Sequence, residues 1–343
     1  MGKILLTGAN GFVAAHILGL LLERGHSVVG TVRSESKADQ LYSLFPSYKN
    51  FLSFAYVPNI EVPGCWDEVI KSTPFDYVLH TASPYSSAFS GTDLLDPAIE
   101  GTKGILKAIK QYGNTVKRVV ITGSFASSIN LAKGDWPGKV YTEEDWNPVT
   151  YEEALTGSWA VTYLASKTFA EKAAWEFLET EKPDFDITVL TPPMVLGPVA
   201  HYVDSLENSN ESTKLIWDLM NGSKETVPAT IFWLYVDVRD LALAHILAFE
   251  KQEAGNQRIL VTGPGNWSFQ KAANILREIP EIRHLVPEGN PDEEFPKGGV
   301  HKSDVSKSVR LLGIEYRSME TSLVDTARNL LAVEKRLKAE GKI

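Results

Sequence analysis

A tyrosine and a lysine four residues apart, Tyr163 and Lys167, are the pair in this sequence with the clearest chemical potential. On a helix this spacing places both side chains on one face. A phenol has a reference pKa of about 10, and a neighbouring ammonium stabilises the phenolate and lowers that pKa. The pair therefore predicts a general acid that protonates a carbonyl oxygen while hydride reaches the carbon. Taken alone, the same spacing is also common on helix surfaces that have no catalytic role.

Two loops favour the catalytic interpretation, because each follows an apolar run that is typical of a buried strand. The run 119–121 leads to Ser124, and the run 77–79 leads to the small residues 81–83. Ligands of open α/β sheets bind at the carboxyl ends of the strands, so we expect both loops and the Tyr/Lys pair to meet in one crevice. There Ser124 would hydrogen-bond a substrate carbonyl as charge develops on its oxygen.

A glycine-rich turn, residues 7–14, follows the first apolar run and opens a helical pattern. Gly8 and Gly11 allow a tight turn and a close approach of the backbone to a pyrophosphate, and the helix N-terminus favours an anion. The spacing G-x-x-G-x-x-A is a weak match to the usual G-x-G-x-x-G motif, but its position at the first strand-to-helix junction supports dinucleotide binding. A turn needed only for packing is the alternative.

The end of the second apolar run indicates which dinucleotide binds. An acid there would accept the ribose 2′-hydroxyl, whereas an arginine would accommodate a 2′-phosphate. The sequence has Arg33 at this point, Lys37 four residues later and no acid on the run, which favours NADPH. The alternative is the solvated start of a helix, because charged residues are common on surfaces.

These residues require a scaffold in which short apolar runs alternate with helical patterns, as in βαβ units on a parallel sheet. We predict an α/β fold, with a Rossmann-type doubly wound parallel sheet and a smaller, interleaved C-terminal substrate lobe. The predicted strands lie at 4–6, 28–29, 54–57, 77–79, 119–121, 187–190 and 259–261, and the predicted helices at about 13–24, 93–112, 158–178, 238–249, 268–277 and 322–337.

The chain is expected to form two interleaved parts. Residues 1–190 would be an NADP-binding Rossmann domain, to which the chain returns near 231–250 and 258–262. Residues 191–343 are punctuated by proline and by polar stretches, and they would form mainly the substrate-binding lobe.

Composition excludes several classes of function. The chain has 343 residues and a net charge of −9 with no basic run, which argues against a nucleic-acid or anionic-membrane partner. No apolar segment reaches the roughly 18 residues of a membrane span, no secretion signal is recognisable, and the single cysteine, Cys65, fits a cytoplasmic protein. The histidines show no metal-ligand spacing, so no metal is expected. The expected partner is a small-molecule carbonyl substrate, and the expected state is a monomer or a homodimer.

Together these segments resemble the extended short-chain dehydrogenase/reductase superfamily. Within it, the sequence is similar to the fungal NADPH-dependent ketoreductases of the methylglyoxal reductase type, which in turn are similar to plant dihydroflavonol 4-reductases. The resemblance spans nearly the whole chain. The residues that carry it are 7–14, 33–34, 79–84, 122–124, 163–175 and 235–240.

The resemblance implies a role for each matching residue. Ser124, Tyr163 and Lys167 would be catalytic, with Tyr163 as the proton donor and Lys167 also holding the nicotinamide ribose. At Asn59 relatives carry Asp, and the asparagine oxygen can still accept a hydrogen bond from the adenine. The residues that would bind the cofactor are Gly8, Gly11, Phe12, Val13, Arg33, Lys37, Asn59, Ile60, Thr81, Ala82, Ser83, Tyr163, Lys167, Pro192 and Val195.

The substrate pocket is predicted from apolar residues near these positions, because small-molecule sites are mostly apolar with a few polar groups. Phe232 and Trp233 stand where the yeast enzymes have small residues, and Met194 replaces an aromatic one. The predicted wall consists of Tyr85, Phe125, Trp159, Met194, Phe232 and Trp233. Each of these could instead be an ordinary core or surface residue.

The sequence therefore predicts an NADPH-dependent reductase of aldehydes and ketones, with two alternatives. A sugar-nucleotide epimerase or dehydratase of the same superfamily would usually have an acid where Arg33 stands. A non-catalytic NADP-sensing regulator would be expected to lose the pair of Tyr163 and Lys167. His80, at a predicted strand end, is expected to be a hydrogen-bonded structural histidine rather than an acid or base.

Overall fold

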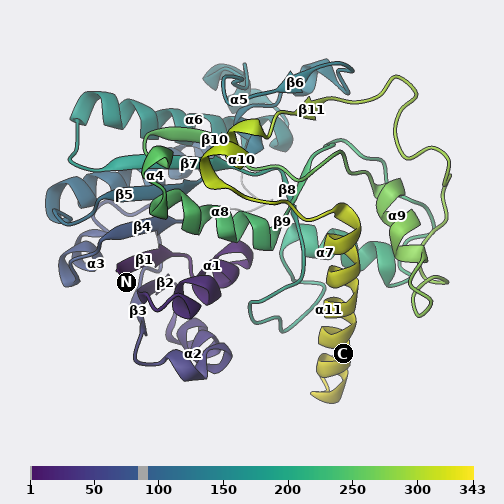
Figure 1. The fold of residues 1–343 in the computed structure, drawn as a ribbon, viewed down its shortest axis with the longest axis horizontal. Helices are drawn as coiled ribbons and strands as arrows, with labels where there is room; N and C mark the ends of the chain where they lie inside the picture. The colour runs from purple at the N-terminus through teal and green to yellow at the C-terminus, as the bar shows by residue number, and fades with distance from the viewer. Residues whose placement is uncertain (1, 84–91) are drawn as a thin grey trace.

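The centre of the protein is a seven-stranded parallel sheet, seen in a computed structural model that describes residues 2–83 and 92–343 (Figure 1). The strand order reverses direction between β1 and β4, and ligands of such sheets bind at this switch point. The predicted doubly wound α/β fold is confirmed. In spatial order the strands are β10 (Gln257–Leu260), β7 (Asp186–Thr191), β5 (Arg118–Thr122), β4 (Tyr77–His80), β1 (Lys3–Thr7), β2 (Ser27–Val32) and β3 (Leu52–Tyr56).

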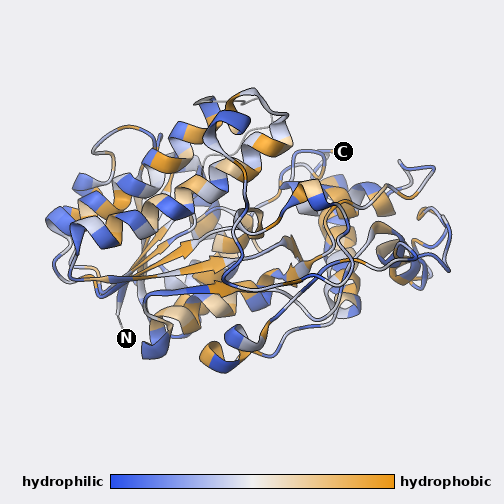
Figure 2. Ribbon diagram, turned by 90° about the horizontal axis from the view of Figure 1, so that it is seen from above, coloured by the Kyte–Doolittle hydropathy of each residue, from blue (hydrophilic) through white to orange (hydrophobic). Residues whose placement is uncertain are grey.

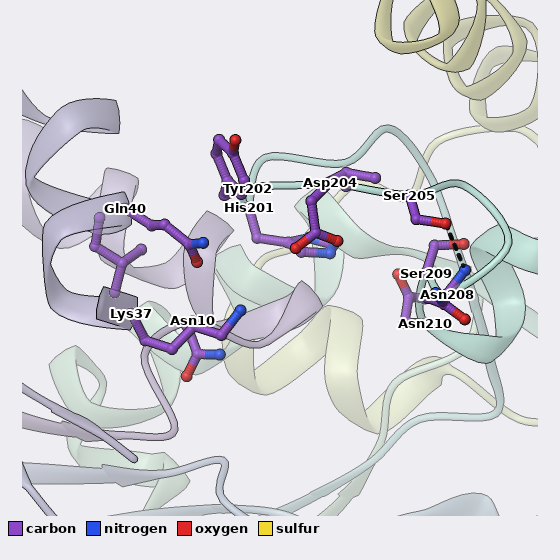
Figure 3. Close-up of a pocket in the computed structure, with 12 residues that line it drawn as sticks. Asn10, Lys37, Gln40, His201, Tyr202, Asp204, Ser205, Asn208, Ser209 and Asn210 are labelled. Carbon is purple, nitrogen blue, oxygen red and sulfur yellow. Dashed lines mark hydrogen bonds between the residues drawn. The ribbon is translucent and has the colours of Figure 1, made fainter. Parts of the chain in front are cut away.

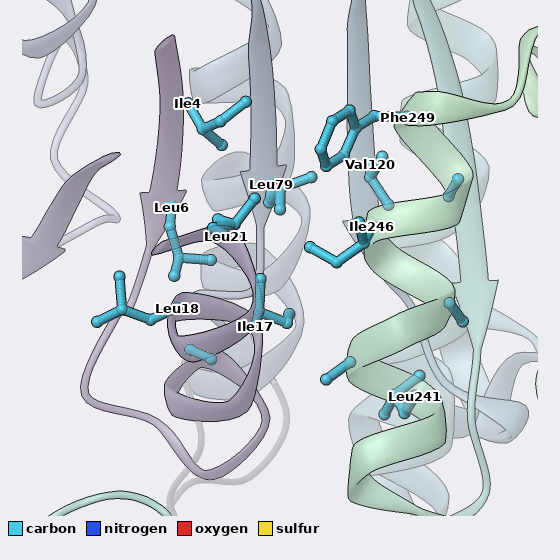
Figure 4. Close-up of a cluster of buried hydrophobic side chains, with 14 of the residues drawn as sticks. Ile4, Leu6, Ile17, Leu18, Leu21, Leu79, Val120, Leu241, Ile246 and Phe249 are labelled. Atoms are coloured by element: carbon cyan, nitrogen blue, oxygen red, sulfur yellow. The ribbon is translucent and has the colours of Figure 1, made fainter. Parts of the chain in front are cut away.

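Helices cover both faces of this sheet, because its strands are apolar on both sides (Figure 2). Ile4 and Leu6 of β1 belong to the core under α1 and α8, whereas Leu5 between them belongs to the core on the opposite face. Figure 4 shows the first of these cores, with side chains of α1 and α8 meeting those of the strands. One layer contains α1 (Phe12–Glu23), α2 (Glu35–Leu44) and α8 (Val238–Glu250), and the other α3 (Asp67–Ser72), α4 (Thr92–Tyr112) and α6 (Trp159–Glu181).

A second group of helices forms a lobe with its own core, in which Trp217, Trp267 and Leu323 are buried. Two short parallel pairs of strands accompany it, β8 with β9 and β6 with β11. The elements outside the main sheet and its layers are α7 (Glu211–Met220), α9 (Phe269–Arg277), α11 (Met319–Ala339), α5 (Tyr151–Thr156), α10 (Ser306–Leu312), β6 (Val140–Tyr141), β8 (Met194–Leu196), β9 (Tyr235–Asp237), β11 (Lys302–Ser303) and the short 3-10 turns η1 (Pro46–Tyr48), η2 (Phe125–Ser127), η3 (Leu131–Lys133) and η4 (Gln252–Ala254).

Ion pairs built on two buried aspartates join the lobe to α8. Arg239 contacts Asp237 and reaches across to Asp325 of α11 at 2.7 Å. Arg317, just before α11, pairs with Asp240, whose side chain is buried. The buried carboxylates of Asp237 and Asp240 require such partners, and the pairs connect α8 to α11 and to the residue just before its N-cap, Ser318.

The predicted strands and long helices are present, with shifted ends. β3 runs from Leu52 to Tyr56 rather than over 54–57, and α6 continues to Glu181. The sequence prediction lacked α2, α3, α5, α7 and α10. Of these, α3, α5 and α10 are short, and α2 buries only Ala38 and Leu41. β10 joins the main sheet beside β7, whereas β9 pairs with β8 in a small sheet of its own. Over the described ranges, no helix combines the length and the apolar character that crossing a membrane would need.

Candidate active site

The first turns of α6 carry Tyr163 and Lys167, and both lie near the loops that follow β4 and β5. The Lys167 ammonium donates a hydrogen bond to the Ser83 hydroxyl at 2.7 Å and lies 5.6 Å from the centre of the Tyr163 ring. Ser124 hydrogen-bonds the Tyr163 side chain. Three segments far apart in sequence are thus in contact at the carboxyl edge of the sheet.

Ser124 is positioned by the tight packing of the residue before it. A Cβ on Gly123 would lie 2.9 Å from Val189 Cγ1, so this glycine lets β5 and its loop pass close to β7. Ser124 then caps η2, its hydroxyl accepting the Ala126 N–H at 3.2 Å. The Phe125 N–H donates to the Pro192 carbonyl at 2.8 Å, which ties this loop to the segment expected beside the nicotinamide.

The pKa of Tyr163 differs from the prediction. Burial raises the pKa of Tyr163 to about 12, with a further rise from the charge of Glu211 and an opposing effect of the hydrogen bond to Ser124. Burial lowers the pKa of Lys167 to about 8. The net shift of the Tyr163 pKa is therefore opposite to the expected lowering, because burial of the phenol is the largest effect and the Lys167 ammonium hydrogen-bonds Ser83.

Thr7, which the sequence analysis did not single out, holds the two loops at the switch point together. Its hydroxyl accepts the N–H groups of Thr81 and Ala82, each at 3.0 Å, and its carbonyl accepts the Thr81 hydroxyl. Gly8 follows with φ of 67°, and a Cβ there would lie 3.2 Å from the Ala82 Cα. A polar residue at the end of a buried strand was the available signal for Thr7.

The N-terminus of α1 lies open at this point. Gly11 is its N-cap, so no side chain caps the helix, and its first turn, which begins with Phe12 and Val13, contains no acid. The Gly8 N–H is already satisfied by the Thr31 hydroxyl at 3.1 Å. The free N–H groups of the first turn therefore favour an anion.

Arg33 and Lys37 stand at the end of β2 and in the first turns of α2. Arg33 is exposed, and neither side chain has an ion pair with any residue of 2–83 or 92–343. Lys37, Asn10 and His201 line a cavity of about 160 Å³ between α2 and the loop that starts at 201 (Figure 3). Burial lowers the pKa of His201 to about 4, and its buried Nδ1 has no hydrogen-bond partner among the described residues.

The expected adenine-binding residues follow β3. Asn59 is exposed, and its side-chain oxygen accepts the Glu61 N–H at 2.8 Å; within residues 2–83 and 92–343 its amide NH₂ has no hydrogen-bond partner. Ile60 is half-buried and packs near Gly101 of α4.

His80 has the structural role expected for it. It is buried at the end of β4, its Nδ1 lies 3.0 Å from the Thr7 hydroxyl, and burial lowers its pKa to about 4. Its ring meets Trp66 edge-on. A neutral, enclosed imidazole of this kind contributes packing and one hydrogen bond.

The residues expected to form the pocket wall occupy different surroundings. Phe125 and Phe232 pack in the same apolar cluster as Tyr163, and the Trp159 ring stacks on Tyr163 with centres 5.2 Å apart. Trp233 is buried, and its N–H donates to Asp135 at 3.0 Å. Met194 begins β8 and packs against the core of the lobe. Tyr85 lies outside the described residues.

A doubly wound sheet with a glycine turn at its switch point is the architecture of dinucleotide-binding proteins. The chain belongs to the NAD dependent epimerase/dehydratase family, whose model matches residues 4–263. This confirms the resemblance seen in the sequence at the level of the superfamily.

Individual relatives match almost end to end. A ketoreductase of Aspergillus niger is 40% identical over 336 residues, which cover 96% of this chain and 97% of the relative. The NADPH-dependent methylglyoxal reductase of Saccharomyces cerevisiae is 38% identical over 348 residues, covering 98% and 100%. The structure of yeast methylglyoxal/isovaleraldehyde reductase complexed with NADPH superimposes with a TM-score of 0.89 at 35% identity, covering 99% of this chain and 100% of that one.

Proposed function

We propose that this protein is an NADPH-dependent reductase of aldehydes and ketones. The observation that carries the proposal is the meeting of Ser124, Tyr163 and Lys167 beside the switch point of the sheet. Relatives that match this chain over nearly its whole length are a ketoreductase and a methylglyoxal reductase, which supports the same class of reaction.

The residues at the switch point fit NADPH. The uncapped N-terminus of α1 would receive the pyrophosphate at Gly8, Gly11, Phe12 and Val13, and Arg33 and Lys37 would pair with the 2′-phosphate. The remaining cofactor contacts would come from Asn59, Ile60, Thr81, Ala82, Ser83, Pro192 and Val195. When bound, NADPH supplies the hydride for the carbonyl carbon.

The chain's own residues would supply the proton and hold the substrate oxygen. With a pKa of about 12, the Tyr163 phenol is fully protonated at neutral pH and can donate its Oη proton to the carbonyl oxygen. The Ser124 hydroxyl would hydrogen-bond the same oxygen. Lys167, charged below about pH 8, would stabilise the phenolate that proton transfer leaves behind.

The division of labour along the chain is part of this proposal. Residues 1–190 would bind the cofactor, with returns near 231–250 and 258–262, and residues 191–343 would mainly form the substrate side. Phe125, Trp159, Met194, Phe232 and Trp233 would shape the pocket. We further propose a cytoplasmic monomer or homodimer that acts on small molecules and not on nucleic acid, in keeping with the net charge of −9.

Two other functions are less well supported. The family also contains epimerases and dehydratases, which usually carry an acid at the end of β2, where this chain has Arg33. A regulator that only senses NADP would have no need of the pair of Tyr163 and Lys167, which is intact.

Purified protein mixed with NADPH and methylglyoxal, isovaleraldehyde, an aryl ketone or a dihydroflavonol tests the proposal. We expect the absorbance of the reduced nicotinamide to fall with at least one of these carbonyl compounds, and much more slowly when NADH replaces NADPH. Activity with a UDP-sugar and none with any carbonyl compound would favour the epimerase alternative. Equal rates with NADH and NADPH would contradict the 2′-phosphate assignment.

A further inference from the structure

The face of α6 that carries Tyr163 and Lys167 also carries a third ionisable residue, Glu171. It follows Lys167 by four residues and Tyr163 by eight, a spacing that keeps all three on one side of the helix. The Glu171 side chain is 1% exposed, and it is paired with Arg258 of β10, which is 7% exposed. Burying two charges costs free energy unless their geometry and further hydrogen bonds compensate, so the surroundings of this pair require an explanation.

Arg258 is held in a single orientation by all three of its guanidinium nitrogens. An arginine fork that is fully bonded in this way is rigid, and its bonds to charged or aligned acceptors are strong. The acceptors are Glu171 Oε1 at 2.6 Å from Nε, the carbonyls of Glu143 and Asp145 at 2.7 and 2.8 Å from Nη1, and the hydroxyls of Ser127 and Ser128 at 2.9 and 3.0 Å from Nη2.

Ser127 connects this charge pair to the backbone of Ser124. Its hydroxyl is fully buried, its oxygen accepts from Arg258 Nη2 at 2.9 Å, and its one proton is shared between two acceptors, Glu171 Oε2 at 2.5 Å and the Ser124 carbonyl oxygen at 2.7 Å. It therefore joins three elements that are distant in sequence: the loop after β5, the catalytic face of α6 and the strand β10. The neighbouring Ser128 hydroxyl accepts from Arg258 in the same way, but no hydrogen bond links it to Ser124 among the described residues.

We infer that Glu171, Arg258 and Ser127 form a positioning network that sets Ser124 against Tyr163. This inference rests on the proposed reductase function. Proton donation and carbonyl binding require the Tyr163 and Ser124 hydroxyls to meet one substrate oxygen, yet the two residues lie on separate elements. The network connects the loop of Ser124 to the helix of Tyr163 through charge-assisted hydrogen bonds that are shielded from water. None of its three members needs to touch the substrate.

Two adjacent serines provide a matched pair of variants for the first test. Ser127→Ala removes the side-chain link between the Ser124 carbonyl and the charge pair and leaves only the Ser127 N–H bond to that carbonyl at 3.0 Å, whereas Ser128→Ala removes an equally buried hydroxyl that bonds the same Arg258 nitrogen. We expect Ser127→Ala to lower kcat about tenfold, because small misplacements of reacting groups can cost on the order of 100-fold. Its KM for NADPH and the activity of Ser128→Ala should stay within about twofold of wild type, since neither variant alters the cofactor contacts.

Hydride transfer can be isolated with NADPH that carries deuterium at the transferred position. In Ser127→Ala the isotope effect on kcat should increase, because misplacement slows the chemical step rather than cofactor release. Equal losses of kcat in both serine variants, or an unchanged kcat in Ser127→Ala, would overturn the inference.

The charge pair itself is tested by separating stability from catalysis. Glu171→Gln leaves Arg258 without its counter-charge, so both Tm and kcat should fall. Combining Glu171→Gln with Arg258→Met removes both buried charges and should restore much of the Tm, while kcat stays low because the link to Ser124 is lost. Recovery of kcat together with Tm would show that the pair is only structural. Asp186→Asn, which breaks the Arg118 pair at the opposite edge of the sheet, should lower Tm and leave kcat of the folded protein unchanged.

The wild-type assay separates this inference from the function on which it rests. If wild type reduces no aldehyde or ketone with NADPH, the proposed function fails and the inference fails with it. If wild type is active and the two serine variants behave alike, the positioning network alone is refuted.

Discussion

The charged side chains at the amino edge of the central sheet differ from those beside the glycine turn at its carboxyl edge. At the amino edge, charges are paired within the protein: Lys117 with Asp76 at 3.0 Å, Arg24 with Glu250 at 3.0 Å, and Arg118 with Asp186. At the carboxyl edge, Arg33 and Lys37 have no ion pair with any described residue, and α1 begins without a capping side chain. The pairs at the first edge stabilise the fold, whereas Arg33 and Lys37 at the second are available to a ligand; the other charges there, such as Arg239 and Arg317, are paired like those of the amino edge.

Arg118 shows how complete the pairing at the amino edge is. Its guanidinium is bidentate on Asp186 and also donates to the carbonyls of Ala248, Lys251 and Gln252 at 2.8, 2.6 and 3.1 Å. The N–H donors of this guanidinium are therefore already used within the protein and are not available to a substrate. The comparison therefore predicts that substitutions at the carboxyl edge affect activity with little loss of stability, and that substitutions at the amino edge do the reverse.

The largest effect is expected from Tyr163→Phe at the carboxyl edge. Removing the phenol hydroxyl removes the proton donor, and general acid catalysis typically contributes on the order of a thousandfold to the rate. The ring remains to stack on Trp159, so folding should be retained. Steady-state turnover should fall to near background, while NADPH titrated by fluorescence should bind with nearly unchanged affinity. Substantial residual turnover would remove Tyr163 from its role.

The second effect concerns the cofactor alone. Arg33→Ala should raise the KM for NADPH about 30-fold, because hydrogen bonds to a charged group contribute about 1.5 to 3 kcal/mol. The KM for NADH, which has no 2′-phosphate, should barely change. Since Arg33 has no ion pair within the described protein, Tm should remain within about a degree or two, as for other surface substitutions. A large fall in Tm would show that Arg33 stabilises the fold and would weaken the contrast between the edges.

The converse substitution is Asp186→Asn at the amino edge. It leaves the nearly buried Arg118 without its carboxylate, which should cost about 2 to 3 kcal/mol in the free energy of unfolding. Urea denaturation measures this loss, and kcat per folded molecule should match wild type. A fall in kcat at full folding would show that the two edges are coupled through β5 and β7.

The sequence predicts features that a few neighbouring residues determine, and it does not predict contacts between residues that are far apart along the chain. The glycine turn and the pair of Tyr163 and Lys167 are local patterns, and the apolar runs located the sheet strands correctly. The pair of Glu171 and Arg258 joins residues 87 positions apart, and the bond from Trp233 to Asp135 spans 98. No local pattern encodes such contacts, because they depend on how the elements pack.

The pKa of Tyr163 was mispredicted for a related reason. Spacing on a helix shows that Lys167 is near the phenol, but it gives no measure of how much surrounding protein excludes water from either group. Burial turned out to be the larger effect, and it acts on both residues in the direction that disfavours their charged forms.

The smallest expected effect is the pH dependence of stability and activity, which also differs between the two edges. At the amino edge the hydrogen bonds between Asp76, Lys117 and the Lys3 N–H lower the pKa of Asp76 and raise that of Lys117, so this pair stays charged throughout the neutral range. At the carboxyl edge burial lowers the pKa of Lys167 to about 8 from its ordinary 10.5. The charged ammonium therefore destabilises the free protein below about pH 8, and this penalty is relieved as the pH rises from 8 towards 10.5.

Activity should move in the opposite direction to stability, because the ammonium that destabilises the fold is the group that stabilises the Tyr163 phenolate. We expect kcat/KM to fall above about pH 8, approaching tenfold per pH unit, as free enzyme loses the Lys167 proton. Tyr163, with a pKa of about 12, stays protonated across this range and cannot cause the fall. In Lys167→Arg the charge persists, so whatever activity remains should lose the decline near pH 8. If that variant kept the same alkaline decline, the group that titrates near pH 8 would not be Lys167. The buried ammonium would then not be the cause of both the lower stability and the activity below pH 8.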